Sequence, residues 1–287
     1  MKFENIDILK SNYKHVYINI LSSLSTYAKI RIYVSFLEKD WVTMTEFEYS
    51  HDKQLLGTDW KSREKHKDDL KITAYHEAGH TLVNIFTENT DPFHKVTIVA
   101  KGQSGGHTAF LPERDATHVT KAQLLARVDV AMGGRAAEEI IFGKDKITGG
   151  ASSDLSGATN IAKGCVKHLG MSDKFGLRVV EGSDNNEEFA MSENTRNLMD
   201  AEINRILNEA YKNATNIIKA HRRELDLLAD ALLKYETLDA EDVKAIIEGN
   251  DKHLTRKNTL SSNSKILYKN PSSINHLPNE KTGFPVL

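Results

Sequence analysis

Residues Ile72–Ile85 read ITAYHEAGHTLVNI and contain the pattern that decides both the local structure and the chemistry of the chain. Apolar residues recur here at spacings of three and four, which predicts a helix with one buried face. On that helix His76 and His80 lie four residues apart on one face, so both imidazoles can bind a single Zn²⁺ ion. Glu77 lies beside them, where its carboxylate can take a proton from an attacking water molecule. This H-E-x-x-H pattern predicts peptide hydrolysis at a zinc site.

The alternative reading of the motif is chance, because the chain contains 12 histidines. The motif lies inside a helical pattern, which is the context that the mechanism requires, and this favours the metal site. The single cysteine, Cys165, excludes a cysteine-based zinc cluster and an internal disulfide. A metal ion in this chain must therefore be held by histidines and carboxylates.

The third zinc ligand is not identified by local spacing. A catalytic zinc needs three protein ligands and an open position for water. Asp154 follows a glycine-rich turn at the start of an expected helix, where an aspartate serves equally well as a helix cap. The residues alone therefore leave a set of five acidic candidates: Glu138, Glu139, Asp145, Asp154 and Asp173.

The remaining pattern predicts a mainly α fold with a small β-element, followed by a helical C-terminal region. Alternating apolar residues at 96–98 and 108–110, separated by a glycine-rich loop, predict two short strands. Gly133 and Gly134 lie in an apolar helical stretch, where they would let another helix approach closely. Helices are expected over residues 120–142, 154–169, 192–220 and 224–233, and a short last helix is expected from about Thr237.

The charge balance and the apolar content exclude several classes of function. The 287 residues contain 38 Lys and Arg against 40 Asp and Glu, a formal net charge of -2, so the chain lacks the field that draws nucleic acid. We therefore expect no nucleic-acid partner. No run of 18 apolar residues occurs, and no G-x-x-x-x-G-K-[ST] sequence that would bind ATP phosphates is present.

The chain resembles the peptidase domain of the FtsH-type ATP-dependent zinc metalloproteases, beginning at Thr73–His80. Five further blocks occur in the same order as in that family, and the resemblance extends over about Val42–Gly249. Val42–Met44 and Ala231–Ala240 are most similar to the mitochondrial i-AAA branch, whose catalytic domain faces the intermembrane space. The five blocks are His94–Ile98, Phe110–Glu113, Met132–Gly143, Gly150–Leu155 and Gly170–Lys174.

The resemblance implies a ligand set and a function. It selects His76, His80 and Asp154 as the ligands of Zn²⁺ and Glu77 as the catalytic base. It implies a zinc endopeptidase that hydrolyses unfolded or membrane-extracted polypeptides in protein quality control at the mitochondrial inner membrane. It also implies a homo-hexamer, or a hetero-assembly with AAA+ subunits.

Members of that family carry a membrane anchor and an AAA+ ATPase module ahead of the peptidase domain, and this sequence matches neither. ATP and the membrane are thus expected to act only through segments outside it. We divide the chain into an unassigned segment at 1–41, an FtsH-type zinc peptidase domain at 42–250, and a Ser-, Asn- and Lys-rich tail at 251–287 that we expect to be disordered. The alternative function is a non-catalytic assembly or scaffold subunit, or a fragment of such a protease. The presence of every predicted ligand and of the base favours the enzyme.

Overall fold

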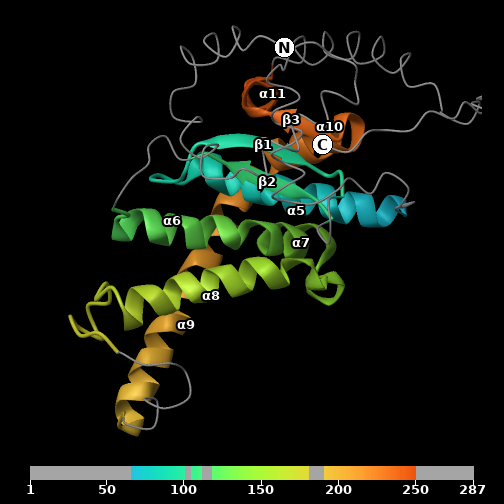
Figure 1. The fold of residues 1–287 in the computed structure, drawn as a ribbon. Coiled ribbons are helices and arrows are strands. Elements are labelled where there is room, and N and C mark those ends of the chain that lie inside the picture. Colours follow the sequence, from blue (N-terminus) through green and yellow to red (C-terminus); the bar gives the residue numbers. More distant parts are fainter. Residues whose placement is uncertain (1–65, 101–104, 112–117, 181–190, 250–287) are drawn as a thin grey trace, which may run out of the picture.

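The computed structural model of the protein describes residues 66–100, 105–111, 118–180 and 191–249. Within these ranges the chain is mainly helical and contains a small sheet, which confirms the predicted fold class (Figure 1). None of the helices in the described part has the length and apolar character that crossing a bilayer requires. The expectations for the segment at 1–41, for the start of the peptidase domain at 42 and for a disordered tail at 251–287 lie outside the described residues and stay predictions.

Helix α5 (Lys67–Phe86) is the centre of the fold and contains the H-E-x-x-H motif, as the sequence predicts. It lies between the sheet and the pair of helices α6 and α7, and it also contacts α9 and α10 (Figure 1). Its side chains at Ala74, Ala78, Leu82 and Val83 are fully buried. The motif is therefore held on a helix that has neighbours on several sides.

The sheet in the described residues contains β1 (Phe93–Thr97), β2 (His107–Phe110) and β3 (Thr237–Asp239), in the order β2-β1-β3. Both pairings are antiparallel, and Val96 of β1 lies opposite Thr108 of β2 and Leu238 of β3. The two expected strands are confirmed, and β2 lies at one edge of the sheet.

Strand β3 was not predicted, because Thr237–Asp239 reads from the sequence as the start of a helix. The capped helix begins two residues later than expected, where Asp239 caps α11 (Ala240–Ile247) in a capping box with Asp242. A strand of three residues has no detectable period of its own. Its pairing with β1 depends on a contact between segments that are distant in the sequence, which local patterns do not show.

The helix expected over 120–142 is divided into α6 (Lys121–Ala131) and α7 (Gly133–Phe142), with a break at Met132. Thr120 and Gln123 form a capping box at the start of α6, and α7 ends at Gly143, which has a positive φ of 88°. The apolar stripe continues through the break, and for this reason the sequence pattern reads as one helix.

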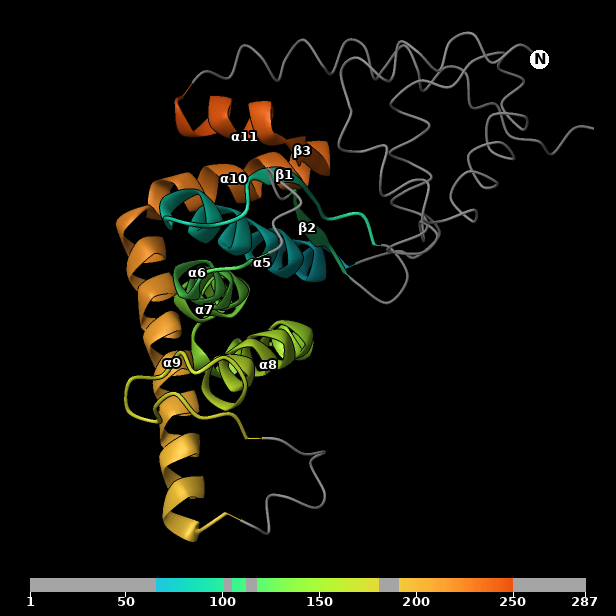
Figure 2. The same cartoon turned by 60° about the vertical axis from the view of Figure 1, so that its left-hand side comes forward.

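Five further elements complete the described chain. The short 3-10 turns η1 (Lys144–Lys146) and η2 (Gly149–Ala151) lead into α8 (Ser152–Lys167), and α9 (Glu193–Ala220) is followed by α10 (Arg222–Tyr235). Figure 2 shows α9 running along one side of the stack formed by α10, α5, the α6–α7 pair and α8, and α9 contacts all five of them. The expected helices are confirmed. Cys165 is buried in α8, and this burial raises the pKa of its thiol.

The backbones of α5 and α7 meet at two glycines. A Cβ atom built on Gly79 would lie 2.5 Å from the carbonyl oxygen of Gly133, and one built on Gly133 would lie 2.7 Å from the carbonyl oxygen of Gly79. Backbone atoms cannot move aside as the end of a side chain can. The close approach expected at Gly133 is therefore confirmed, and its partner on the other helix is Gly79.

We predict that Gly79→Ala lowers the free energy of unfolding by about 1–3 kcal/mol or more, because the added methyl group overpacks a backbone contact. The control is Gly164→Ala in α8, where nothing lies within 4 Å of the added Cβ. This change should be neutral or stabilising by up to about 1 kcal/mol, since alanine is the better helix former. Denaturant unfolding with a chelator present, so that metal binding does not contribute, measures both values. Equal effects at the two positions would contradict the close contact.

Candidate metal centre

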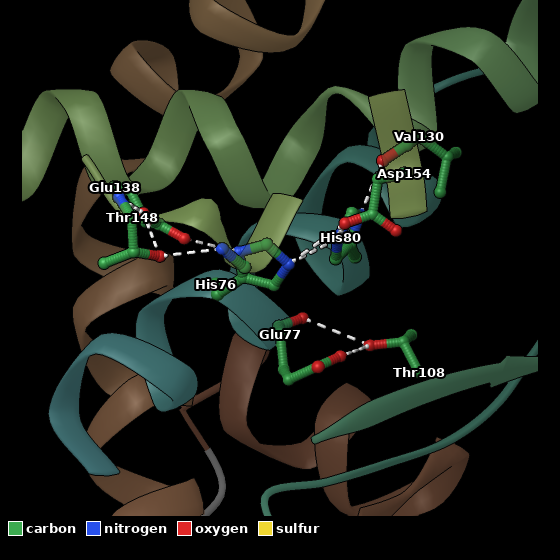
Figure 3. Close-up of polar contacts among 9 residues, drawn as sticks. His76, Glu77, His80, Thr108, Val130, Glu138, Thr148 and Asp154 are labelled. Carbon is green, nitrogen blue, oxygen red and sulfur yellow. Dashed lines mark hydrogen bonds and ion pairs between the residues drawn. The ribbon is translucent and has the colours of Figure 1, made fainter. Parts of the chain in front are cut away.

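Three side chains from two helices converge beside the sheet (Figure 3). His76 and His80 project from the same face of α5, and their Nε2 atoms are 3.1 Å apart. Asp154, in the first turn of α8, places Oδ2 at 3.3 Å from Nε2 of His76 and at 3.5 Å from Nε2 of His80. In the described part of the chain this is a group with the composition and spacing of a metal site.

The three separations fit one metal ion of zinc's size. Zinc binds histidine nitrogens and carboxylate oxygens at about 2.0–2.2 Å in a tetrahedral arrangement, in which two ligand atoms are about 3.3 Å apart. The observed edges of 3.1, 3.3 and 3.5 Å agree with that value. The three side chains therefore already lie at the separations that one tetrahedral ion requires.

The proton of each imidazole is fixed by a partner on the far side of its ring. Nδ1 of His80 lies 2.8 Å from the carbonyl oxygen of Val130, which can only accept a hydrogen bond. Nδ1 of His76 lies 2.7 Å from Oε1 of Glu138. Because Nδ1 donates in both residues, the lone pair of the neutral ring lies on Nε2, which is the atom that faces the shared position.

Glu138 is the buried carboxylate of the Glu138–Glu139 pair and is only 1% exposed. Its Oε2 accepts hydrogen bonds from the backbone N–H of Thr148 at 2.8 Å and from the Thr148 hydroxyl at 3.0 Å. These contacts with Thr148 and with His76 hold the pKa of Glu138 below its ordinary value in spite of burial, so the carboxylate remains charged. Glu138 therefore binds Nδ1 of His76, on the side of the ring away from His80 and Asp154.

The electrostatics of the site favour a positive charge. Burial lowers the pKa of His76, but hydrogen bonds to Asp154 and Glu138 outweigh this and raise its pKa to about 10. Burial likewise raises the pKa of Asp154, but hydrogen bonds from His76 and His80 bring its pKa well below the ordinary range. Without a metal, the two ionised carboxylates therefore hold His76 protonated, and a divalent cation that displaces this proton finds the same two negative charges around it.

The other acidic candidates lie elsewhere. Asp173 is exposed and forms an ion pair with Lys121 at 3.6 Å, and Asp145 is exposed in η1. Glu139 accepts a short hydrogen bond from the Tyr211 hydroxyl. The cap reading of Asp154 also fails, because α8 begins after Ala151 and has no side-chain cap hydrogen bond. Of the five candidates, Asp154 alone joins the two histidines.

Glu77 lies in a cleft of about 450 Å³ that also contains the three metal-site side chains. The side chain is 6% exposed, and its Oε2 accepts a hydrogen bond of 2.6 Å from the hydroxyl of Thr108 on β2. The roles of Glu138 and Thr108 were missed from the sequence. The sequence favours one buried, paired carboxylate in the Glu138–Glu139 pair but does not show that its partner is His76. Thr108 is one threonine in a short strand, with no local signal that it meets the motif.

Comparison with known proteins gives the same classification for most of the chain. The model described as peptidase family M41 matches residues 63–246. The ATP-dependent zinc metalloprotease YME1L of Drosophila melanogaster is 53% identical over 207 residues, which are 72% of this chain and 28% of that protein. The YME1 homolog of Caenorhabditis elegans is 46% identical over 245 residues, 84% of this chain and 34% of that protein.

A plant relative is the ATP-dependent zinc metalloprotease FTSH 11, chloroplastic/mitochondrial, of Arabidopsis thaliana. It is 42% identical over 228 residues, which are 79% of this chain and 27% of that protein. The chain thus spans about a third or less of the length of the curated relatives it matches.

We predict that Asp154→Asn weakens zinc binding by more than about 100-fold. The loss of a residue that only hydrogen-bonds a metal ligand costs roughly 10- to 100-fold. The amide keeps the size of the side chain and caps a helix as well as aspartate does, but it removes the anionic ligand. Competition with a fluorescent zinc chelator measures the affinity. Unchanged affinity would exclude the ligand role of Asp154.

We predict that Glu138→Gln lowers the zinc affinity about 10- to 100-fold. The two oxygens of Glu138 accept hydrogen bonds from His76 and Thr148, and in glutamine one of them is replaced by an NH₂ group, which cannot accept. The matched control is Glu139→Gln, which changes the same residue type one position along α7 but contacts Tyr211 and not the histidines. This variant should keep the affinity of the unchanged protein. The same chelator competition separates the two, and equal losses would point to a general effect on α7.

Proposed function

The chain belongs to peptidase family M41, and from this premise we propose that it is a zinc endopeptidase in which His76, His80 and Asp154 hold the ion and Glu77 is the general base. The observation that carries the proposal is the triangle of three ligand atoms, 3.1 to 3.5 Å on a side, in one open cleft with Glu77. A metallopeptidase needs a metal position, a base and access for a polypeptide, and the cleft brings these together.

His76, His80 and Asp154 would hold the zinc ion, which would supply Lewis-acid chemistry to the scissile carbonyl and to the attacking water. The protein's own part is to orient and to move a proton. Glu77 takes the proton from the attacking water and delivers it to the leaving amine. The Nδ1–H bonds of His76 and His80 keep both rings turned toward the cleft while this occurs.

The edge of β2 gives the cleft a means of holding an extended chain. The cleft is lined by Thr108 and Phe110 of this strand, and β2 lies at the outside of the sheet. A substrate can add to such an edge near 108–111 through main-chain hydrogen bonds, which do not depend on its sequence. A folded protein does not offer a free extended segment, so we propose unfolded or membrane-extracted polypeptides as the substrate class.

We propose further that this domain works with an AAA+ ATPase that unfolds its substrates, in a homo-hexamer or in a hetero-assembly with AAA+ subunits. In support, the relatives that match it are named as ATP-dependent zinc metalloproteases, and the matched part is only 27–34% of the length of each. The similarity to the YME1 homologues supports a mitochondrial location. Within the mitochondrion we propose the intermembrane-space side of the inner membrane for the peptidase.

The experiment is cleavage of casein, a loosely folded protein, by the zinc-loaded chain, with and without a chelator. We predict that Glu77→Gln keeps its zinc and loses about 10²- to 10⁴-fold in kcat, because an amide has the shape of the carboxylate but cannot accept the proton. Metal content and product formation are measured on the same samples. Full turnover by the Gln variant would contradict the base assignment. If the unchanged, zinc-loaded chain leaves casein intact, the result favours a non-catalytic assembly subunit.

A further inference from the structure

Glu77 is held by the strand at which substrate is proposed to bind. We propose that Thr108 of β2 is a positioning residue for Glu77, and that its hydroxyl holds one carboxylate oxygen so that the other remains directed to the proton of the attacking water. This inference rests on the proposed function, since it assigns a partner to the base named there. The contact joins two segments that lie 31 residues apart in the sequence.

The hydrogen bond itself is short and well defined. The Thr108 hydroxyl lies 2.6 Å from Oε2 of Glu77 and 3.4 Å from the backbone oxygen of the same residue (Figure 3). A hydroxyl has one proton to donate, and the charged oxygen at the shorter distance is the stronger acceptor. The carboxylate therefore takes the proton, and Oε2 is occupied.

Gly106, two residues before Thr108, borders the space that the second carboxylate oxygen of Glu77, Oε1, occupies. A Cβ atom built on Gly106 would lie 2.8 Å from both Cγ and Oε1 of Glu77. The absence of a side chain at Gly106 is thus what leaves room for Oε1. With Oε2 bound to Thr108 and Oε1 beside Gly106, one segment of 106–108 sets the position of the whole carboxylate.

Packing alone does not account for a threonine at this position. Thr108 lies opposite Val96, and cross-strand partners project to the same face of a sheet. Val96 is fully buried on that face, so the strand tolerates a β-branched apolar residue there. Valine has the shape of threonine and favours strands equally. What threonine adds is the hydroxyl, and its partner is Glu77.

The hydrogen bond from Thr108 would link substrate binding at β2 to the orientation of Glu77. A peptide that adds to β2 orders the backbone of the strand that includes Thr108, and the side chain of Thr108 in turn fixes Glu77. Reactions of this kind depend on geometry within fractions of an ångström, so a base that rotates freely loses part of its effect even though its carboxylate is intact.

The test compares Thr108→Val with Thr108→Ser in the zinc-loaded chain. Valine removes the hydroxyl and keeps the shape, and serine keeps the hydroxyl and removes the methyl group. We expect Thr108→Val to lower kcat for casein peptides about tenfold with little change in KM or in zinc content, and Thr108→Ser to retain most of kcat. Tenfold is below the range for complete loss of a general base. Combination with Glu77→Gln should add no further loss, because the two changes remove one function.

A binding measurement gives a readout that does not require turnover. A peptide hydroxamate binds a metal ion and presents a hydroxyl to a carboxylate beside it, whereas the same peptide as a plain amide contacts the cleft alone. By calorimetry, we expect Thr108→Val to weaken hydroxamate binding about three- to tenfold, the value of one hydrogen bond. The amide should bind Thr108→Val and the unchanged protein alike.

The results distinguish a failure of the role of Thr108 from a failure of the proposed function. Equal kcat and equal hydroxamate affinity in Thr108→Val and the unchanged protein would overturn the role of Thr108 while leaving the peptidase in place. Equal losses in the Val and Ser variants, or a loss confined to KM, would show that Thr108 acts through packing or strand binding, which also overturns the inference. If the unchanged protein binds neither zinc nor the hydroxamate, the proposed function itself fails.

Discussion

The direct contact between the backbones of α5 and α7 is the constraint on which the site depends. Two helices normally stay 8–10 Å apart because their side chains separate them. Here glycines face each other, so the carbonyl of Gly133 comes within 2.5 Å of where a Cβ of Gly79 would lie. The next residue, Gly134, then lies directly against the rings of His76 and His80, where its own Cβ would come within 2.6 Å of both. Only at this distance can Glu138, one turn further along α7, reach Nδ1 of His76. A larger interhelical distance would leave a buried carboxylate without its partner.

Asp154 reaches the histidines by a different route, because α8 does not pack primarily on α5. Helix α8 contacts α6 and α9, and α9 in turn contacts α5, α6 and α7. Asp154 is thus positioned by the packing of the whole helical stack, whereas the two histidines are positioned within one helix. A metal ion that binds all three side chains binds the folded state only, and so it stabilises the arrangement that creates its site. This dependence on tertiary packing explains why sequence spacing could not choose among the acidic candidates.

The parts of the structure that were predictable are those with a local cause. The motif helix, the two strands beside the glycine-rich loop and the long C-terminal helices follow from apolar periodicity and capping residues. The break at Met132 is concealed because the apolar stripe runs through it. Strand β3 exists only through its pairing with β1. The residues alone left Asp154 as one of several candidates, and the resemblance selected it. In the structure α8 begins at Ser152, so Asp154 lies inside the helix and not at its cap. The contacts of Glu138 and Thr108 were not predictable, since each is a pairing across distant segments.

The polar groups around the site are linked by hydrogen bonds, so that each group orients the next one. His80 donates to a neutral carbonyl, while His76 donates to the carboxylate of Glu138 and so faces a carboxylate on each side of its ring. A carboxylate that is 1% exposed is costly unless it is hydrogen-bonded, and the two donors of Thr148 meet that need. Thr148 precedes η2 and α8, the helix that carries Asp154. Thr148, which with His76 holds the pKa of Glu138 low, therefore also begins the turn that brings Asp154 to the histidines. The orientation of His76 and the placement of Asp154 thus both depend on this segment.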